Sequence, residues 1–378
     1  MPESYDPEFV SYEHVMFTEI EEYNASAFNW EKKTDLSLRN GNVVVLGGYG
    51  LVIKVINGSL SIEYQRSHDT DKILKMNRGV HKVKTIVVSS HGGYITLDAI
   101  IWMVQQGITL YLIDWRGEIL QTLTPRQSRN ARLCYYQVKA SQEELGVDIA
   151  RELVYRKTLA HIEVLKSISE YTHKRTFRKY RASRNWDKPA WQALESMLEE
   201  LPCVSGINAV LMLEARLAMT YWNTFVGIPI KFDTRAAKIV PEHWLSVTER
   251  MSGLTQNTSQ ATNPFHAALN FAYALLEAQV IQAINVAGLE PTVGFLHAYQ
   301  DGKPSLAYDL MECFRAYVDA KVLAIFQNTT FSKGDFVQWY TGECRLNEEL
   351  RRYILAECRV DNTQIDLQCR WLRSTLEN

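Results

Sequence analysis

The chain has 378 residues, of which 46% are apolar and 22% charged, which excludes wholesale disorder and favours a globular protein of two domains. The formal net charge of -2 is nearly neutral, so any binding of nucleic acid must depend on local basic patches rather than on the total charge. Six scattered cysteines without a C-x-x-C pair argue against a structural zinc site and against a disulfide framework.

The first forty residues have an acidic composition of their own. Seven acidic residues fall between Glu3 and Glu22, and no Lys or Arg precedes Lys32, which predicts a weakly ordered acidic extension over residues 1–40. The stretch MPESYDPEFVSYEH lacks the basic and apolar regions of a signal peptide, and the apolar run at 100–104 is far too short to span a membrane. We therefore expect a soluble, cytoplasmic protein with reduced thiols and no membrane partner.

A β-rich domain is predicted over residues 41–124. The stretch VVVLGGYGLVIKVINGSLSIEYQ contains two partly alternating, β-branched runs joined by Asn57-Gly58, which is the strongest two-residue signal for a β-hairpin. The run TIVVSS predicts one more strand. Further along the chain we expect a helix over Leu97–Gln106 that ends at Gly107, and strands over Thr109–Asp114 and Ile119–Thr122.

After a linker over residues 125–128, the sequence becomes helical in propensity and spacing, with Gly146 as the only breaker of its first long segment. Ser205 is expected to cap a helix that runs to about Trp222. Asn263 followed by Pro264 predicts a helix that ends at Gly288. The predicted fold class is α+β: a small, β-rich N-terminal domain, a larger all-α domain over residues 129–354, and a C-terminal tail over residues 355–378.

One carboxylate falls in an unusual helix. Glu214 lies in INAVLMLEARLAMTYW, a segment that is apolar nearly all round and that is therefore expected to be buried. A buried carboxylate needs a compensating cation or takes up a proton. The compensating group is either an arginine, such as Arg216 or one at the domain edge, or a metal ion.

A second candidate cluster lies in GFLHAYQDGKPSLAYDLMECFR, residues 294–315. Asp309 and Glu312 are three residues apart and share a helix face, and His297 precedes a turn-rich segment that brings the chain back over that helix. The simpler interpretation pairs Glu312 with Arg315 on the surface and leaves His297 as an ordinary loop residue. Together with Glu214, however, these residues form a mixed oxygen and nitrogen ligand set that suits Mg²⁺ or Mn²⁺.

At these residues the sequence resembles the CRISPR-associated integrases and endonucleases of spacer acquisition, with their transposon-borne relatives, the casposases. The resemblance spans about Asn42 to Ile354. It rests on the ordered segments LGGYGLVIKVINGSLSI, ITLDAIIWMVQQGITLYLIDWRGEIL, LMLEARLAMTYW, NPFHAALNFAYALLEAQV, GFLHAYQDGKPSLAYDLMECFR and GDFVQWYTGECRLNEELRRYI. The pairing of GFLH with SLAYDLMECFR, downstream of the Glu-bearing helix, is its most specific part.

The resemblance implies a β-sandwich-like domain that forms a homodimer and a helical catalytic domain. It also implies that Glu214, His297 and Glu312 are catalytic residues that bind Mg²⁺ or Mn²⁺, with Asp309 in support. At position 266 the chain has a histidine where the family commonly has asparagine. His266 either contacts DNA or metal or, as we favour, is a buried structural histidine.

A local basic patch is predicted in YTHKRTFRKYRASRNW, residues 171–186, which has six basic residues, no acid and interleaved aromatics. Such a run is either a solvated helix face or a DNA contact in which cations neutralise phosphates and rings stack on bases. We favour DNA contact. The candidate DNA-binding residues are Lys174, Arg175, Arg178, Lys179, Arg181 and Arg184.

Three functions remain open at this point. The leading hypothesis is a metal-dependent DNA integrase and endonuclease that joins a DNA 3′-hydroxyl end to a target phosphodiester, acting on double-stranded and branched DNA with a small companion adaptation protein. The second is a casposase or stand-alone homologue that integrates transposon ends. The third is a non-catalytic, dimeric DNA-binding scaffold whose carboxylates are structural.

Overall fold

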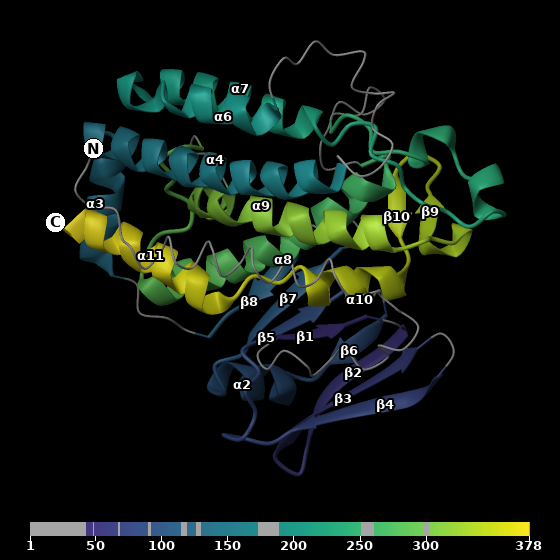
Figure 1. Ribbon diagram of the computed structural model, residues 1–378. Helices are drawn as coiled ribbons and strands as arrows, with labels where there is room; N and C mark the ends of the chain where they lie inside the picture. The colour runs from purple at the N-terminus through teal and green to yellow at the C-terminus, as the bar shows by residue number, and fades with distance from the viewer. Residues whose placement is uncertain are drawn as a thin grey trace.

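The structure is a computed structural model that describes residues 43–47, 49–66, 69–89, 92–114, 119–125, 130–172, 189–250, 261–297 and 302–377. Within them, two four-stranded sheets are followed by a stack of helices (Figure 1). The α+β fold class, with its strand-rich N-terminal part and larger helical part, is confirmed. The predicted acidic extension lies outside the described residues.

The strands of the N-terminal part form two sheets with the orders β1-β5-β7-β8 and β4-β3-β2-β6. Their bounds are β1 (Val43–Leu46), β2 (Tyr49–Ile56), β3 (Ser59–Arg66), β4 (Asp69–Met76), β5 (Thr85–Val88), β6 (Gly93–Ile95), β7 (Thr109–Ile113) and β8 (Ile119–Leu123), and helix α2 (Leu97–Gln105) lies between β6 and β7. The predicted strands and the short helix are therefore present.

The turn between β2 and β3 shows why this hairpin forms. Asn57 and Gly58 both have positive φ, 51° and 77°, as a two-residue turn that matches the twist of the strands requires. Ile56 pairs with Ser59 directly across the turn. The predicted hairpin is confirmed.

The first sheet packs against an apolar core on each of its two faces. On β5, Ile86 and Val88 face a core shared with the second sheet, whereas Val87 between them faces the core of the helices. Successive residues of a strand point to opposite faces, so this sheet separates two apolar cores. On β7, the Tyr111 hydroxyl donates a 2.6 Å hydrogen bond to the Ala278 carbonyl of a helix, which anchors the sheet to the helical part.

The helical part consists of long helices in layers (Figure 1). Their bounds are α3 (Ala131–Ser141), α4 (Glu144–Thr172), α6 (Ala190–Leu198), α7 (Ile207–Asn223), α8 (Pro264–Ala287), α9 (Ser305–Asn328), α10 (Glu348–Glu357) and α11 (Asn362–Glu377), with short 3₁₀ turns at Leu201–Cys203, Ala236–Lys238, Glu242–Trp244 and Lys333–Asp335. Helix α9 lies between α4 and α8, and α6 and α7 pack on α4 on the side away from the sheets. A small hairpin, β9 (Phe336–Gln338) with β10 (Cys344–Leu346), adds two strands that the all-α prediction for this part did not include.

The central helix α8 begins and ends as predicted. The Asn263 side chain caps the Phe265 amide, Pro264 is the first helical residue, and Gly288 ends the helix in the left-handed conformation. The helix is long and apolar enough to cross a membrane, but 78% of its most apolar window is buried inside the fold. It is a core helix of this protein.

Two local expectations are wrong. Gly206, not Ser205, is the N-cap residue of α7, and no side chain caps that helix. Gly206 turns the chain at a φ of 78°, which a residue without a Cβ adopts at little cost. The burial of α7 is also only partial: Leu213 and Leu217 are buried, but Met212 and Met219 are exposed, because α7 is an outer helix of the stack.

The segment 355–378, set apart in the sequence as a tail, contains the end of α10 and helix α11. The Ile365, Cys369 and Leu372 side chains of α11 are buried, and the helix packs against α8 and α3. All six cysteines lie in described residues and are free thiols, as the scattered spacing predicted.

Candidate functional site

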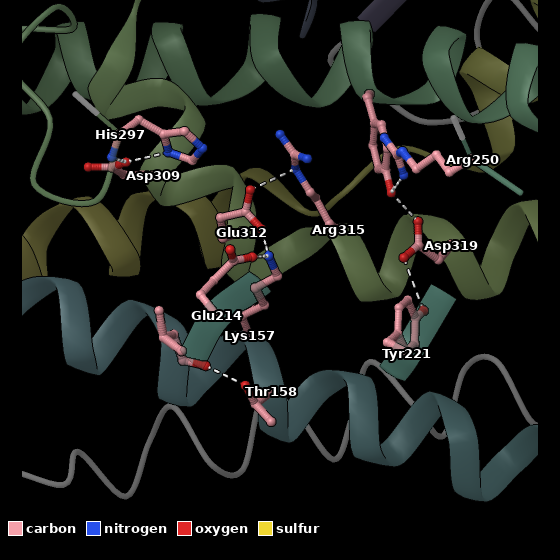
Figure 2. A network of polar contacts seen from close by, with 12 residues as sticks. Lys157, Thr158, Glu214, Tyr221, Arg250, His297, Asp309, Glu312, Arg315 and Asp319 are labelled. Atoms are coloured by element: carbon pink, nitrogen blue, oxygen red, sulfur yellow. Dashed lines mark hydrogen bonds and ion pairs between the residues drawn. The ribbon is translucent and has the colours of Figure 1, made fainter. Parts of the chain in front are cut away.

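Two carboxylates from different helices meet at one lysine in the helical part (Figure 2). The ammonium Nζ of Lys157, in the middle of α4, lies 2.5 Å from Oε1 of Glu214 on α7 and 2.6 Å from Oε2 of Glu312 on α9. Only 3% of the Glu312 side chain is exposed, against 21% for Glu214. The packing of α4 against both α7 and α9 is what brings the three charges together.

A second cation stabilises the charge of the deeper carboxylate. The Arg315 Nε lies 3.3 Å from Oε1 of Glu312, one turn along α9. Burial alone would raise the pKa of Glu312, but the charges of Arg315 and Lys157 outweigh burial and lower this pKa to about 2. Burial also disfavours the charged form of Lys157 and by itself would lower its pKa. The two glutamates outweigh burial, so the pKa of Lys157 is raised above its ordinary value. Glu312 and Lys157 are therefore both ionised at neutral pH.

Asp309 holds the loop that carries His297. Its carboxylate accepts hydrogen bonds from the backbone amides of Phe295, Leu296 and His297 and from the His297 ring, whose Nδ1 lies 2.7 Å from Oδ1. The Asp309 side chain is fully buried, whereas the His297 side chain is 41% exposed. Asp309 therefore fixes the ring with Nδ1 toward the carboxylate, and Nε2 is directed away from it (Figure 2).

The pKa of His297 reflects this arrangement. Burial lowers it, but the hydrogen bond to Asp309 and the charges of Asp309 and Glu312 raise it above its ordinary value. The charge of Arg315 acts in the opposite direction and lowers this pKa, but less than the acids raise it.

Gly294 is a further residue of this loop that the sequence reasoning missed. A Cβ at this position would lie 2.8 Å from Oδ2 of Asp309, closer than real Cβ contacts allow, and 3.0 Å from the His297 carbonyl oxygen, which is also tight. The backbone can reach the Asp309 carboxylate only because residue 294 has no side chain. The signal was present in the GFLH segment, whose first residue is this glycine.

The predicted metal ligands meet only in part. Within the ranges that the structure describes, no three His, Cys, Asp or Glu side chains gather closely enough to hold a metal ion. Glu214 and Glu312 converge, and carboxylate oxygens suit Mg²⁺ or Mn²⁺, but Lys157 lies between them and His297 bonds Asp309. The two carboxylates thus fit part of a metal site, and the three-ligand site stays a prediction.

The simpler interpretations of the acidic residues hold only in part. Arg216 pairs with Glu200 at 2.8 Å, so it does not compensate Glu214, which pairs with Lys157 instead. Glu312 does pair with Arg315, but in the interior rather than on the surface. The role of Lys157 was missed because a lone lysine in a helical segment usually lies on the surface.

A further buried acid lies two turns beyond Glu312 on α9. Asp319 accepts hydrogen bonds from the hydroxyls of Tyr221 and Tyr273. Burial raises its pKa to about 6, more than these bonds and nearby arginines lower it. The Arg315 guanidinium lies 5.1 Å from the centre of the Tyr273 ring, and it also pairs with Glu312. Arg315 thus lies between Glu312 and the tyrosine that donates a hydrogen bond to Asp319.

Two remaining predictions concern nucleic-acid contacts. His266 is buried and its Nε2 lies 2.9 Å from the Thr248 carbonyl oxygen, which confirms the interpretation as a structural histidine. Burial lowers its pKa to about 4, so the ring is neutral and donates this bond. The six basic candidates between residues 174 and 184 lie outside the described residues, and their contact with DNA stays a prediction.

The fold and the site define a class of protein: a two-part α+β chain whose helical part holds two carboxylates around one cation. The family model described as CRISPR associated protein Cas1 matches residues 44–359. The chain therefore belongs to the Cas1 family, and all the residues of the carboxylate site fall within the matched region.

Similar proteins agree with this assignment. The CRISPR-associated endonuclease Cas1 2 of Pyrobaculum aerophilum is 24% identical over 294 residues, which cover 77% of this chain and 85% of that protein. A casposase bound to integration product has a TM-score of 0.72 and 25% identity, covering 89% of this chain and 90% of its own. A chain of a Cas6-RT-Cas1–Cas2 complex, at 17% identity and a TM-score of 0.65, shares the fold over 90% of this chain and 35% of its own.

Proposed function

We propose that this protein is a metal-dependent DNA integrase and endonuclease that joins a DNA 3′-hydroxyl end to a target phosphodiester. The observation that carries the proposal is the meeting of Glu214 and Glu312, from two helices, within 2.6 Å of one cationic atom. Family membership and a relative named as an endonuclease support phosphodiester chemistry at this point.

The residues of the site would divide the work as follows. Glu214 and Glu312 would hold a Mg²⁺ or Mn²⁺ ion, with His297 as the third ligand. When bound, such an ion stabilises the charge that develops on phosphoryl oxygens during in-line displacement. Asp309 would keep the His297 ring oriented, with its Nδ1 proton engaged and Nε2 free to act as a ligand.

In the proposed reaction, the 3′-hydroxyl oxygen of an incoming end attacks the target phosphorus, and the bond to the target 3′ oxygen breaks. One new phosphodiester forms, one is lost, and a new 3′-hydroxyl is released. The reverse reaction resolves branched DNA, and water in place of the hydroxyl gives hydrolysis.

A strand-transfer assay tests the proposal. The protein is incubated with a 3′-hydroxyl oligonucleotide and supercoiled plasmid, with and without Mn²⁺. We expect joined, relaxed plasmid only with Mn²⁺ and only with a free 3′-hydroxyl. Glu214→Ala should abolish joining while leaving DNA binding largely intact. Joining by this variant at the wild-type rate would refute the assignment.

A casposase-type function is the nearest alternative, and the structural similarity to a casposase bound to integration product supports it. The two functions share one chemistry and differ in the DNA ends that are integrated. A CRISPR array and a companion adaptation gene beside this gene would indicate spacer acquisition. Terminal inverted repeats and a polymerase gene would indicate a transposon. The Cas1–Cas2 complex among the structural neighbours supports a companion protein, and a homodimer remains part of the proposal.

A non-catalytic DNA-binding scaffold is the third candidate. The observation in its favour is that Lys157 already forms ion pairs with both carboxylates, as a purely structural lysine would. A scaffold would bind DNA equally well with or without Mn²⁺ and would show no Mn²⁺-dependent cleavage of branched DNA.

A further inference from the structure

The ammonium of Lys157 lies where the two acidic side chains of the site converge. We propose that Lys157 is an internal counter-cation: it positions Glu214 and Glu312 in the metal-free protein and has to leave them when a divalent cation binds. The inference rests on the proposed function, because it presumes that these carboxylates are metal ligands.

The ammonium already occupies the point at which one oxygen of each glutamate converges. The Lys157 nitrogen lies 2.5 and 2.6 Å from one oxygen of each glutamate. A divalent cation such as Mg²⁺ would need carboxylate oxygens at about 2.0–2.1 Å. Two cations bonded to the same pair of oxygens would repel each other strongly in a buried site. Binding of a metal to these two oxygens therefore requires the ammonium to move.

The burial of Lys157 and its partners explains why this lysine stabilises the two carboxylates in the metal-free protein. Its side chain is 10% exposed and that of Glu312 only 3%. An uncompensated buried carboxylate is unfavourable, so the ammonium stabilises the metal-free fold. The three residues come from α4, α7 and α9, and the lysine thus also holds these helices in the register in which their carboxylates meet.

Another lysine of α4 offers a matched comparison. Lys166 also contacts two glutamates, Glu163 on its own helix at 3.2 Å and Glu195 on α6 at 3.3 Å. Its side chain is 41% exposed and those of its partners 49% and 44%, so solvent screens the pairs. Lys166 shares residue type, helix and charge pattern with Lys157 but lies apart from the proposed metal ligands.

Removing the buried ammonium should have two opposite effects. The metal-free protein loses the counter-charge of two carboxylates and becomes less stable. A divalent cation, in contrast, no longer has to displace a cation and binds more tightly. An ordinary structural lysine would produce the first effect without the second.

The test is a titration of the protein with Mn²⁺ in the absence of DNA. The concentration of free Mn²⁺ is measured by electron paramagnetic resonance at each step. We expect Lys157→Met to lower the Kd for Mn²⁺ by at least about tenfold. The melting temperature without metal should fall, and the rise on adding Mn²⁺ should exceed that of the wild type. Lys166→Met should keep the wild-type Kd. An unchanged or higher Kd for Lys157→Met would overturn the proposal.

Two further variants keep the test decisive. Lys157→Arg keeps the positive charge, so this variant should fold and should bind Mn²⁺ no more tightly than the wild type. Tighter binding by Lys157→Arg would contradict the role of the charge. This outcome can be measured even if Lys157→Met fails to fold. Glu214→Gln separates this inference from the proposed function. If it weakens Mn²⁺ binding while Lys157→Met leaves the Kd unchanged, only the role of Lys157 fails. If the wild type itself binds no Mn²⁺, both fail.

Discussion

Two of the buried acids on helix α9, Glu312 and Asp319, lie seven residues apart and have different surroundings. Glu312 pairs with two cations, Lys157 and Arg315, and its pKa is lowered to about 2. Asp319 accepts hydrogen bonds from two tyrosine hydroxyls, and its pKa is raised to about 6. Burial acts in the same direction on both acids. The partners therefore decide which acid is a permanent anion that suits metal binding and which is part of the structural core.

The largest expected effect in this comparison is on activity. Glu312→Gln removes the anion but keeps the shape, so we expect Mn²⁺-dependent cleavage of branched DNA to fall by about a thousandfold or more. Asp319→Asn makes the same kind of change seven residues away and should leave activity within about tenfold of the wild type. Equal losses in both variants would show that the two acids of α9 do not differ in function.

A smaller loss is expected when His297 loses its support. Asp309→Asn replaces the acceptor of three backbone amides and of the imidazole with a side chain that has one acceptor oxygen. We expect strand transfer to fall by about 10- to 100-fold, with DNA affinity unchanged in a filter-binding measurement. A parallel loss of DNA affinity would mean that the loop contacts DNA rather than serving the metal site.

The titration of Asp319 predicts a pH effect on stability. Its pKa is about 6 in the folded protein and 3.8 in an ordinary carboxyl, so the folded state holds the proton more tightly. The stability contributed by protonated Asp319 is fully present below about pH 4 and is lost as the pH rises through about 6. Relative to Asp319→Asn, the free energy of unfolding of the wild type should fall by on the order of 1–3 kcal/mol over this range. Urea titrations of both proteins at several pH values measure the difference, and a constant difference would contradict the assignment.

The smallest effect is expected at Arg216. This residue pairs with Glu200 on the surface, with 54% and 48% of the two side chains exposed, and exposed pairs contribute little. Arg216→Ala should leave the urea midpoint and the cleavage rate unchanged within error. A clear loss of cleavage would show that the neighbour of Glu214 acts in the reaction despite its position.

Much of the fold was predictable because its signals are local. The Asn57-Gly58 turn and the cap formed by Asn263 and Pro264 depend on conformational preferences of neighbouring residues. The errors at Ser205 and on the outer face of α7 arose because capping and burial depend on what lies outside the helix. Nothing in INAVLMLEARLAMTYW tells which apolar residues face α4 and which face solvent.

The site was predictable to a different degree. The residues Glu214, His297, Asp309 and Glu312 were singled out from residue types, spacing and the family resemblance, and their joint role as a metal site stays a prediction. Lys157 and Gly294 were not, since their roles depend on distances across the fold. A lysine 57 residues before Glu214 becomes its partner only through the packing of α4 on α7 and α9, and no spacing along the chain encodes that contact.

The sheet β1-β5-β7-β8 has a consequence for how the molecule can be divided. Its Val87 and Tyr111 side chains belong to the core of the helices, while their strand neighbours Ile86 and Leu110 belong to the core of the other sheet. If the chain were divided near residue 125, each fragment would expose to solvent an apolar surface that is buried in the intact protein. The intact protein should thus unfold in one calorimetric transition, and neither half should be obtained as a soluble, folded fragment.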